Sequence, residues 1–594
     1  MNECPKIMSR LYCASITLAL LTFGPAACTS VPKAASPQLT SETHQKPADQ
    51  AFTKLSQAFI DEYLELFPVV ASALGDHSRD GEWGDYSKAG AARVEAFYHK
   101  YQEALQKVDV TQLSPDNQVD AAVLTNEVNS RLFEMENLAP LRNSAMSYVG
   151  VLSLGLDSLI SQNYGTPSRR AQALIQRLQG LPKVVAAARE RLENPSKLDT
   201  QTAILQTSGL LELCQTGIKP LMEKAPEHAQ ALNQAAVSAR AAIQDLKTFL
   251  EKDVLPRSNR DFRLGKTLYA RKIQYDLVDS IHPDALAQSA RAALNRTLAG
   301  MYAVAVKLSP ELLGKPAKVS QDPKEQRKLV RAVLDRMALE QPTDATLFTE
   351  AEQAIDAASA FIREKQILTV PNEKCQVIRM PAFNAGFAGA YSQSSGPFDD
   401  KFENFVAIEP PAAAERDSFY REYNKSMLIE LMLHEAVPGH CLQAMHAVKT
   451  RHPLRAIFGN GPYTEGWAMY SEEVMANHGF GGQRIKMVQL KLLARAIANT
   501  LLDYGVHTQN MSEVEAMKLL MDETYQERAE AAGKWRRVQL SSVQLTTYFY
   551  GYQQFAAMRQ AAEKQPGFEE KKFHDQLLAS GAPPLKLLRT RFGI

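Results

Sequence analysis

One stretch of the sequence decides the fold around the expected site: Leu433-His434-Glu435-Ala436-Val437-Pro438-Gly439-His440-Cys441-Leu442-Gln443. Its two histidines are six positions apart, whereas the HExxH motif of metallopeptidases places two histidines four apart on one helix face. Six steps of about 100° leave the second side chain roughly 120° from the first, so a straight helix cannot direct both at one metal ion. Pro438 interrupts a helix, and Gly439 tolerates the unusual backbone angles that follow. We therefore expect the helix to break at Pro438 and the break to bring His440 back towards His434.

A second motif supplies an acidic residue 25 positions after His440: Tyr463-Thr464-Glu465-Gly466-Trp467-Ala468-Met469-Tyr470-Ser471-Glu472-Glu473. We expect a helix from Glu465 to near His478, with Glu465 and Glu472 on one face. Five of the 12 histidines lie between positions 434 and 478, where an even distribution would place about one. Two histidines and a downstream glutamate, with one position open, are the ligands of a catalytic zinc. The pattern predicts Zn²⁺ on His434, His440 and Glu465; taken singly, each residue would also suit a structural role.

Composition excludes several classes of protein. The 594 residues are 45% hydrophobic and include 67 basic and 66 acidic side chains, which excludes a disordered chain and argues against nucleic acid as a partner. No apolar run outside the N-terminus is long enough to span a membrane. The internal cysteines Cys214, Cys375 and Cys441 allow at most one bridge, and we predict none.

The N-terminus is typical of an export signal. Residues 1–28 combine a basic start, an apolar stretch and small residues before Cys28, which resembles a bacterial lipobox despite Pro25. Cys28 is therefore the predicted lipidation site, and residues 29–49 are a flexible tether. We expect an exported lipoprotein on the periplasmic face of a bacterial membrane, with no other membrane contact. An uncleaved apolar helix is the alternative.

The rest of the chain divides into a helical lobe, residues 50–365, and a catalytic lobe, residues 366–594. Helical periodicity is clearest in four segments: Ala51–Leu66, Ser168–Leu192, Glu227–Leu255 and Pro283–Leu308. Gly180-Leu181-Pro182 and Leu255-Pro256 are expected to interrupt helices. Short β-type runs follow at Ile367–Val370, Cys375–Met380 and Phe405–Ile408. The prediction is a mainly α fold with a small β element beside the active-site helix.

The two motifs resemble those of the bacterial DUF885 proteins, which are often lipoproteins and are related to gluzincin metallopeptidases. The similarity runs from about Asp61 to the C-terminus. Further family elements are matched by Pro68, Gly75, Asp76, His77 and Asp80, by Arg495, Asp503, Gly505 and His507, and by Gln544, Tyr548 and Gly551. Two positions depart from the family: Cys441 replaces a common second His, and Ser542-Val543 replace Pro-Gly. The resemblance implies a large, channelled helical fold like the angiotensin-converting-enzyme and thimet-oligopeptidase group, and makes His440 the required ligand.

The expected function is zinc-dependent hydrolysis of short peptides. Zinc would acidify water and polarise the carbonyl, and Glu435 would transfer the proton to the leaving amine. The candidates for stabilising the oxyanion are His507, Tyr548 and Tyr550, although Tyr548–Tyr552 would equally suit a buried helix face. An edge strand at 383–391 would pair with the peptide. The predicted substrate-binding residues are Gly386, Gly389, Tyr391 and Arg495. A non-catalytic peptide-binding lipoprotein and a zinc hydrolase of a non-peptide amide are the alternatives.

Overall fold

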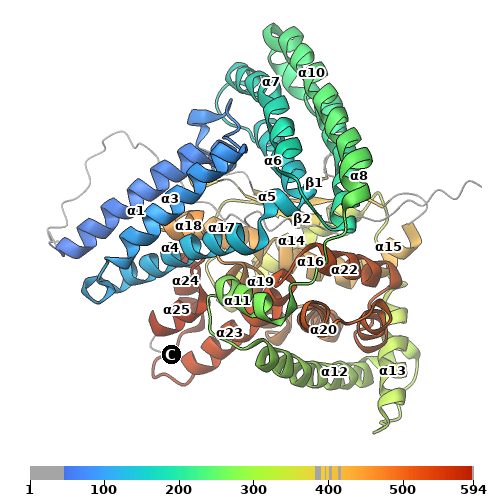
Figure 1. The fold of residues 1–594 in the computed structure, drawn as a ribbon. Coiled ribbons are helices and arrows are strands. Elements are labelled where there is room, and N and C mark those ends of the chain that lie inside the picture. Colours follow the sequence, from blue (N-terminus) through green and yellow to red (C-terminus); the bar gives the residue numbers. More distant parts are fainter. Residues whose placement is uncertain (1–45, 381–389, 395, 400–403, 412–415, 592–594) are drawn as a thin grey trace, which may run out of the picture.

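The structure is a computed structural model that describes residues 46–380, 390–394, 396–399, 404–411 and 416–591 (Figure 1). It is mainly helical with one small sheet, which confirms the predicted fold class. The predicted signal segment, Cys28, Gly386 and Gly389 lie outside the described residues. Within the described residues, no single helix is long and apolar enough to cross a membrane, although Pro115–Asn143 and Ala145–Ser161 meet that criterion together as a pair bent by 87°.

The first ten helices, coloured blue to green, occupy the upper and left-hand parts of the view in Figure 1. They are α1 Pro47–Leu66, α2 Pro68–Ala73, α3 Lys88–Gln106, α4 Pro115–Phe133, α5 Pro140–Asn143, α6 Ala145–Ser161, α7 Pro167–Arg191, α8 Lys197–Glu212, α9 Lys219–Lys224 and α10 Ala229–Phe249. Local sequence explains where many of them begin. The side-chain oxygens of Ser87, Ser114, Thr166 and Ser196 each accept a backbone N–H of the first turn, which satisfies a donor that the helix itself leaves unpaired.

Four helices lead to the sheet: α11 Gly265–Leu277, α12 Pro283–Leu313, α13 Pro323–Met337 and α14 Leu347–Lys365. The strands are β1 Cys375–Arg379, β2 Ala390–Gln393 and β3 Asn404–Ile408. β3 is central, parallel to β1 with Val377 opposite Val406 and antiparallel to β2 with Tyr391 opposite Ala407. The sheet packs between α14 and the helix α17, His440–Ala447. It therefore supports one helix of the expected site.

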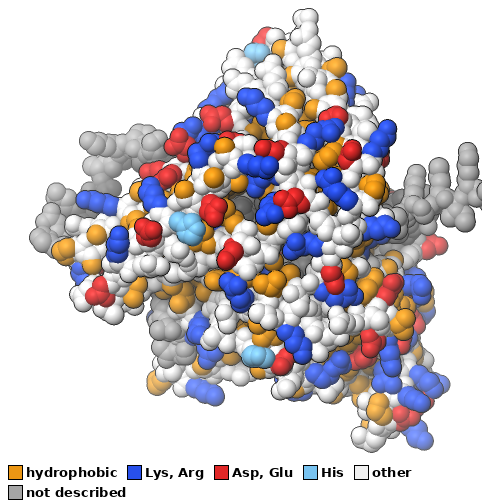
Figure 2. All heavy atoms as spheres, viewed as in Figure 1, with side chains coloured by type: hydrophobic (Ala, Val, Ile, Leu, Met, Phe, Trp, Pro, Cys, Tyr) orange, Lys and Arg blue, Asp and Glu red, His pale blue; other side chains and the backbone are white. Residues whose placement is uncertain are grey.

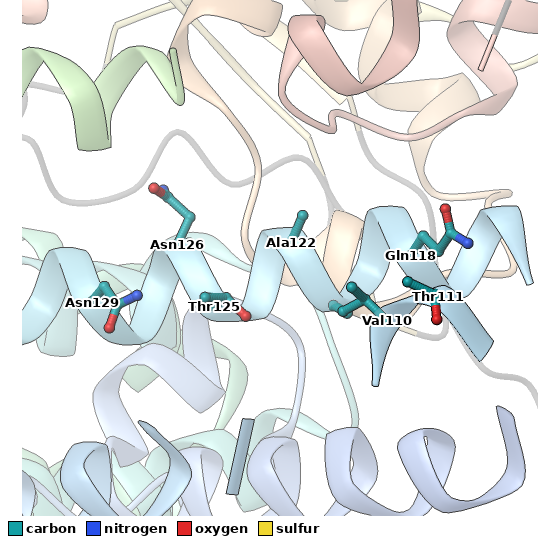
Figure 3. Close-up of a pocket in the computed structure, with 8 residues that line it drawn as sticks. Val110, Thr111, Gln118, Ala122, Thr125, Asn126 and Asn129 are labelled. Atoms are coloured by element: carbon teal, nitrogen blue, oxygen red, sulfur yellow. The ribbon is translucent and has the colours of Figure 1, made fainter. Parts of the chain in front are cut away.

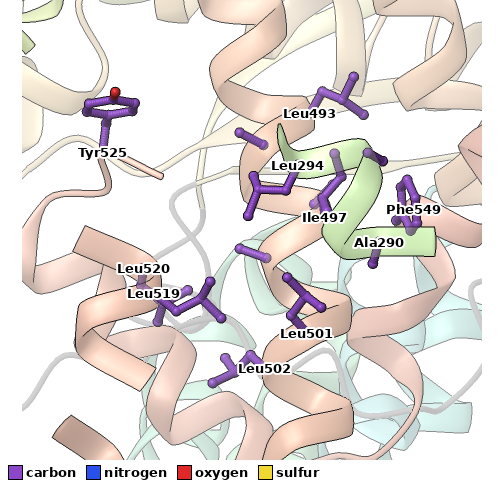
Figure 4. Packing of buried hydrophobic residues seen from close by; sticks show 14 of the residues in the cluster. Ala290, Leu294, Leu493, Ile497, Leu501, Leu502, Leu519, Leu520, Tyr525 and Phe549 are labelled. Atoms are coloured by element: carbon purple, nitrogen blue, oxygen red, sulfur yellow. The ribbon is translucent and has the colours of Figure 1, made fainter. Parts of the chain in front are cut away.

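The remaining helices form the C-terminal part of the chain. They are α15 Arg416–Glu422, α16 Lys425–Glu435, α17, α18 Pro453–Ile457, α19 Gly461–Asn477, α20 Gly482–Gln509, α21 Glu513–Met517, α22 Arg528–Leu540, α23 Thr547–Ala562, α24 Glu570–Ala579 and α25 Leu585–Arg591. The long helices α12 and α20 pack side by side, and Figure 4 shows Ala290 and Leu294 of α12 beside Leu493 and Ile497 of α20. This apolar core also contains Met427 of α16 and Met469 of α19, so it packs against two helices of the site.

The hydrophobic cores cross the expected lobe boundary at residue 365. One core joins buried side chains of residues 269–337 to those of residues 427–550. Another joins the first helices to Leu454, Ile457 and Phe458. Arg455 is fully buried there and donates from Nε to Oδ1 of Asp120 on α4 at 2.5 Å. The two expected lobes therefore share hydrophobic cores and pack directly against each other.

Local predictions fail where tertiary contacts override them. Residues 367–370 form no strand, because the Thr369 N–H bonds the Asp575 carboxylate at 2.7 Å and the Ile367 carbonyl accepts from His574 at 2.9 Å. Helix α7 continues through Pro182, because its apolar face stays buried on both sides of the proline. Helix α1 begins at Pro47, so the last residues of the predicted tether are helical.

Candidate metal centre

The helix that carries His434 ends at Glu435, and the next helix begins at His440. The predicted break at Pro438 is therefore confirmed. Gly439 is essential to it, because a Cβ at this position would lie 1.7 Å from the His434 carbonyl oxygen. The Gly439 N–H instead donates to the Leu433 carbonyl at 2.9 Å. As a result the two imidazole rings come together, with centroids 4.7 Å apart.

Three side chains converge at this break. Nε2 of His440 lies 3.5 Å and Nε2 of His434 lies 3.9 Å from Oε2 of Glu465, and one donor atom from each residue lies within 4.8 Å of the others. Two ligands held about 2.0–2.1 Å from one ion at a tetrahedral angle are about 3.4 Å apart. The separations, the donor types, the burial of Glu465 and the partial burial of the two histidines therefore fit a zinc ion.

Helix α19 positions Glu465 through two close contacts. The Trp467 indole is 1% exposed and donates to the Pro438 carbonyl at 2.9 Å, which ties α19 to the break between α16 and α17. On the other side, Gly466 packs against Gly551 of α23, where an added Cβ would lie 2.4 Å from the Gly551 Cα. These contacts fix the position of α19 relative to the two histidines. Glu465 lies one turn inside α19 and not at its start as predicted.

A buried glutamate contacts the outer nitrogen of His434. Oε1 of Glu472 lies 2.6 Å from Nδ1 of His434, which leaves Nε2 directed to the centre. Glu472 and Glu430 are both fully buried, and burial raises the pKa of each carboxyl well above its ordinary value. A carboxylate on the distal nitrogen is the usual outer support of a metal-bound histidine. Sequence reasoning placed Glu472 only on the face of Glu465 and missed Glu430, although Glu430 and His434 have the i, i+4 spacing of one helix face.

Electrostatics favour a neutral His434. Burial lowers its pKa to about 4, so the imidazole is unprotonated at neutral pH and offers a lone pair. Burial also acts to lower the pKa of His440, but the Glu465 carboxylate outweighs it and raises that pKa to about 8. Burial acts to raise the pKa of Glu465, but its hydrogen bond with His440 outweighs this, and the net pKa is lowered. Without a cation, His440 and Glu465 thus form an ion pair.

The three candidate oxyanion donors lie in different surroundings. Nε2 of His507 is 3.0 Å from the carbonyl oxygens of both Val538 and Ser541, so this nitrogen already hydrogen-bonds to the C-terminal end of α22. Tyr550 is fully buried, and its hydroxyl donates to Asp279 at 2.8 Å. Both of these donor groups are therefore engaged with other groups of the chain in this structure. The Tyr548 hydroxyl instead lies 3.3 Å from Nη2 of Arg537, and the charge of Glu465 contributes, after burial, to raising its pKa.

The predicted substrate residues that can be placed are Tyr391 and Arg495. Tyr391 lies in β2, an edge strand whose other side pairs with β3. Arg495 lies on α20 and bonds the Glu530 carboxylate of α22.

A disulfide joins Cys375 of β1 to Cys441 of α17, contrary to the expectation of no bridge. Sequence could not reveal it, because the two cysteines are 66 positions apart and meet only when α17 packs on the sheet. Cys441 directly follows His440, one of the candidate ligands. The bridge therefore attaches the second half of the broken helix to β1.

Comparisons with known proteins place the chain among bacterial proteins of unknown function. The family model described as "Bacterial protein of unknown function (DUF885)" matches residues 68–592. Two solved structures are similar: one from Shewanella oneidensis, 27% identical, with a TM-score of 0.72 over 91% of this chain and 100% of its own, and one from Colwellia psychrerythraea, 17% identical, with a TM-score of 0.75 over 92% and 99%. Each is described as a putative lipoprotein, the first as one of unknown function. No curated protein matches.

Proposed function

This chain belongs to the DUF885 family of bacterial proteins of unknown function, and we propose that it is a zinc-dependent metallopeptidase that hydrolyses short peptides. The observation that carries the proposal is the convergence of His434, His440 and Glu465 at a helix break, with a second glutamate adjacent to the first ligand. A glutamate in that place is the general base of HExxH peptidases. A protein that only binds peptides has no need of it.

The residues of the chain divide the chemistry among them. When bound, zinc lowers the pKa of a water molecule and polarises the scissile carbonyl. Glu435 accepts the proton of that water and returns it to the leaving amine. The Tyr548 hydroxyl is the candidate donor to the developing oxyanion, because His507 and Tyr550 are committed to other partners. Glu472 holds His434 in the orientation that directs Nε2 inward.

The proposal includes a relationship to the gluzincin metallopeptidases. It is supported by the His, His and Glu donor set and by Glu435. The difference is the spacing of six between the two histidines, which Pro438 and Gly439 accommodate. We infer that the broken helix is an expanded form of the HExxH arrangement.

Two surfaces suit an extended peptide. Among the described strands, β2 lies at the edge of the sheet, which is the position where an extended peptide can add a strand. A groove of about 630 Å³ runs along α4 near its junction with α11, where the Asn126 amide donates to the Tyr275 carbonyl. Figure 3 shows the hydroxyl and amide side chains of Thr125, Asn126 and Asn129 projecting from α4. The described residues that line this groove are uncharged, so it suits the neutral backbone of a peptide.

The face of the molecule shown in Figure 2 carries no basic footprint for a nucleic acid. Acidic and basic side chains are interspersed over the face shown in Figure 2, without a large area of one sign. This agrees with the near balance of 67 basic and 66 acidic residues. Nucleic-acid binding would require a basic footprint. We therefore keep a short peptide as the proposed partner.

We propose that the protein is an exported lipoprotein anchored through Cys28 on the periplasmic face of a membrane. The lipobox-like sequence and the lipoprotein descriptions of the two similar structures support this. Mass spectrometry of the mature N-terminus provides the test. A diacylglyceryl group on Cys28 is expected, whereas a free N-terminus near Ala27 or Thr29 would make the protein soluble in the periplasm.

The peptidase is tested by metal content and cleavage together. Protein purified without chelator should contain one zinc per chain and cleave members of an unstructured peptide library, with little action on folded proteins. Glu435→Gln should retain the zinc and lose turnover, because the amide is nearly isosteric but cannot accept the proton. His446→Ala is the matched control, since His446 lies on α17 but bonds the Thr369 carbonyl. Zinc without cleavage of any peptide would favour a binding protein or a non-peptide amidase.

A further inference from the structure

Basic side chains lie buried beside the candidate metal centre, on α20 and α22. Lys534 and Arg537 of α22 are each 7% exposed, and Arg495 of α20 is largely buried. Arg495 bonds Glu530, and this carboxylate is also the nearest one to Lys534, at 3.7 Å. Lys534 makes no hydrogen bond to any described residue. A buried ammonium that shares its nearest carboxylate with a guanidinium is poorly compensated.

The group is electrostatically linked to the centre. Burial, followed by Arg495 and Arg537, holds the pKa of Lys534 well below its ordinary value, and the Glu465 carboxylate is among the charges that act against this. The Arg537 guanidinium also lies 3.3 Å from the Tyr548 hydroxyl, the candidate oxyanion donor. Gly466, the neighbour of Glu465, packs against Gly551, which is one turn from Tyr548 on α23, so the contact between Arg537 and Tyr548 lies close to the candidate metal centre. A zinc ion there would add to the positive potential.

We propose that Arg495, Lys534 and Arg537 form a subsite that binds a carboxylate of the substrate beside the scissile bond. The inference rests on the proposed peptidase function and adds the substrate class: peptides with a carboxylate close to the cleavage point. That carboxylate is the C-terminus of the peptide or an acidic side chain. A guanidinium binds either in a bidentate manner, and a substrate carboxylate would offset positive charge that Glu530 shares between Arg495 and Lys534.

Binding to the Glu435→Gln protein separates the subsite from turnover. The probes are an acetylated alanine hexapeptide with a free C-terminal carboxylate, the same peptide as its C-terminal amide, and an amidated version with one internal glutamate. Calorimetry should show the free acid binding about tenfold to a hundredfold more tightly than the plain amide, as expected for a charge-assisted contact. If the glutamate peptide shows the preference instead, the carboxylate comes from a side chain. Equal affinity for all three peptides, or no binding, overturns the proposal.

Substitutions assign the effect to the buried group. Lys534→Gln should remove most of the preference for the acid, and Lys534→Arg should retain it. Arg536→Gln is the matched control, since it removes the same charge from the same helix at a half-buried position outside the group. Melting temperatures of all variants check folding. A full preference in Lys534→Gln would also overturn the assignment.

The two proposals fail in different ways. If the wild-type protein prefers the acid but cleaves none of the peptides, the subsite stands and the peptidase does not. If it cleaves the acid and both amides at equal rates, the peptidase stands and the subsite does not.

Discussion

The contact between Glu472 and His434 predicts a measurable effect on zinc affinity. Oε1 of Glu472 lies 2.6 Å from Nδ1 of His434 in a fully buried environment, so water cannot replace it. Loss of such an outer contact usually lowers metal affinity by about 10- to 100-fold, or roughly 1.4–2.7 kcal/mol. Glu472→Gln keeps an oxygen that accepts the N–H, so its zinc affinity should fall by about tenfold. Glu472→Ala removes the acceptor, so its zinc affinity should fall by about a hundredfold.

The assay is competition for zinc between the apoprotein and a chromophoric chelator at pH 7. Glu473→Gln is the control, because Glu473 is the next residue on α19 but accepts from the Tyr552 hydroxyl at 3.0 Å. Circular dichroism establishes that each variant is folded. If Glu472→Gln, Glu472→Ala and the control all bind zinc as the wild type does, Glu472 does not orient His434 and the reasoning is wrong.

Three further predictions concern the frame around the centre. Gly466→Ala should destabilise the protein by about 1–3 kcal/mol in urea denaturation, because its Cβ would meet the Gly551 backbone at 2.4 Å; an unchanged midpoint would contradict the close packing of α19 and α23. Burial lowers the pKa of His574 to about 4 from an ordinary value near 6.5. The neutral imidazole therefore contributes roughly 3 kcal/mol to the free energy of unfolding above pH 6.5, and this contribution is lost as the pH falls towards 4. His574→Gln should flatten the stability profile in that window, and an identical pH profile would refute this. Reduction of the Cys375–Cys441 disulfide should lower the free energy of unfolding by about 2–4 kcal/mol and weaken zinc binding. Thermal melts and zinc titrations with and without dithiothreitol measure both effects. If neither changes, the bridge does not stabilise the site.

Much of the candidate site was predictable because its signals are local. A proline and a glycine between His434 and His440 predict a break whatever surrounds them, since each acts on its own backbone. The downstream Glu465 is recognisable as a ligand because its residue type and its position on a helix are both readable from sequence. The mainly helical class follows in the same way from apolar periodicity.

Other features depended on pairs of residues that are distant along the chain. The strand expected at residues 367–370 is absent because Asp575 and His574 take its backbone hydrogen bonds. Cys375 and Cys441 form a bridge only because α17 packs on the sheet.

The sequence by itself therefore determined the helical class, the break at Pro438 and the candidate ligand set. Tertiary structure alone decided which carboxylate orients His434, which tyrosine remains near Glu465, and that Arg495, Lys534 and Arg537 gather beside it. The physical reason is that a residue's backbone preferences act within a few positions of it. The partner of a buried polar group depends instead on how closely α16, α19, α20 and α22 approach one another, and that is set by packing of the whole core.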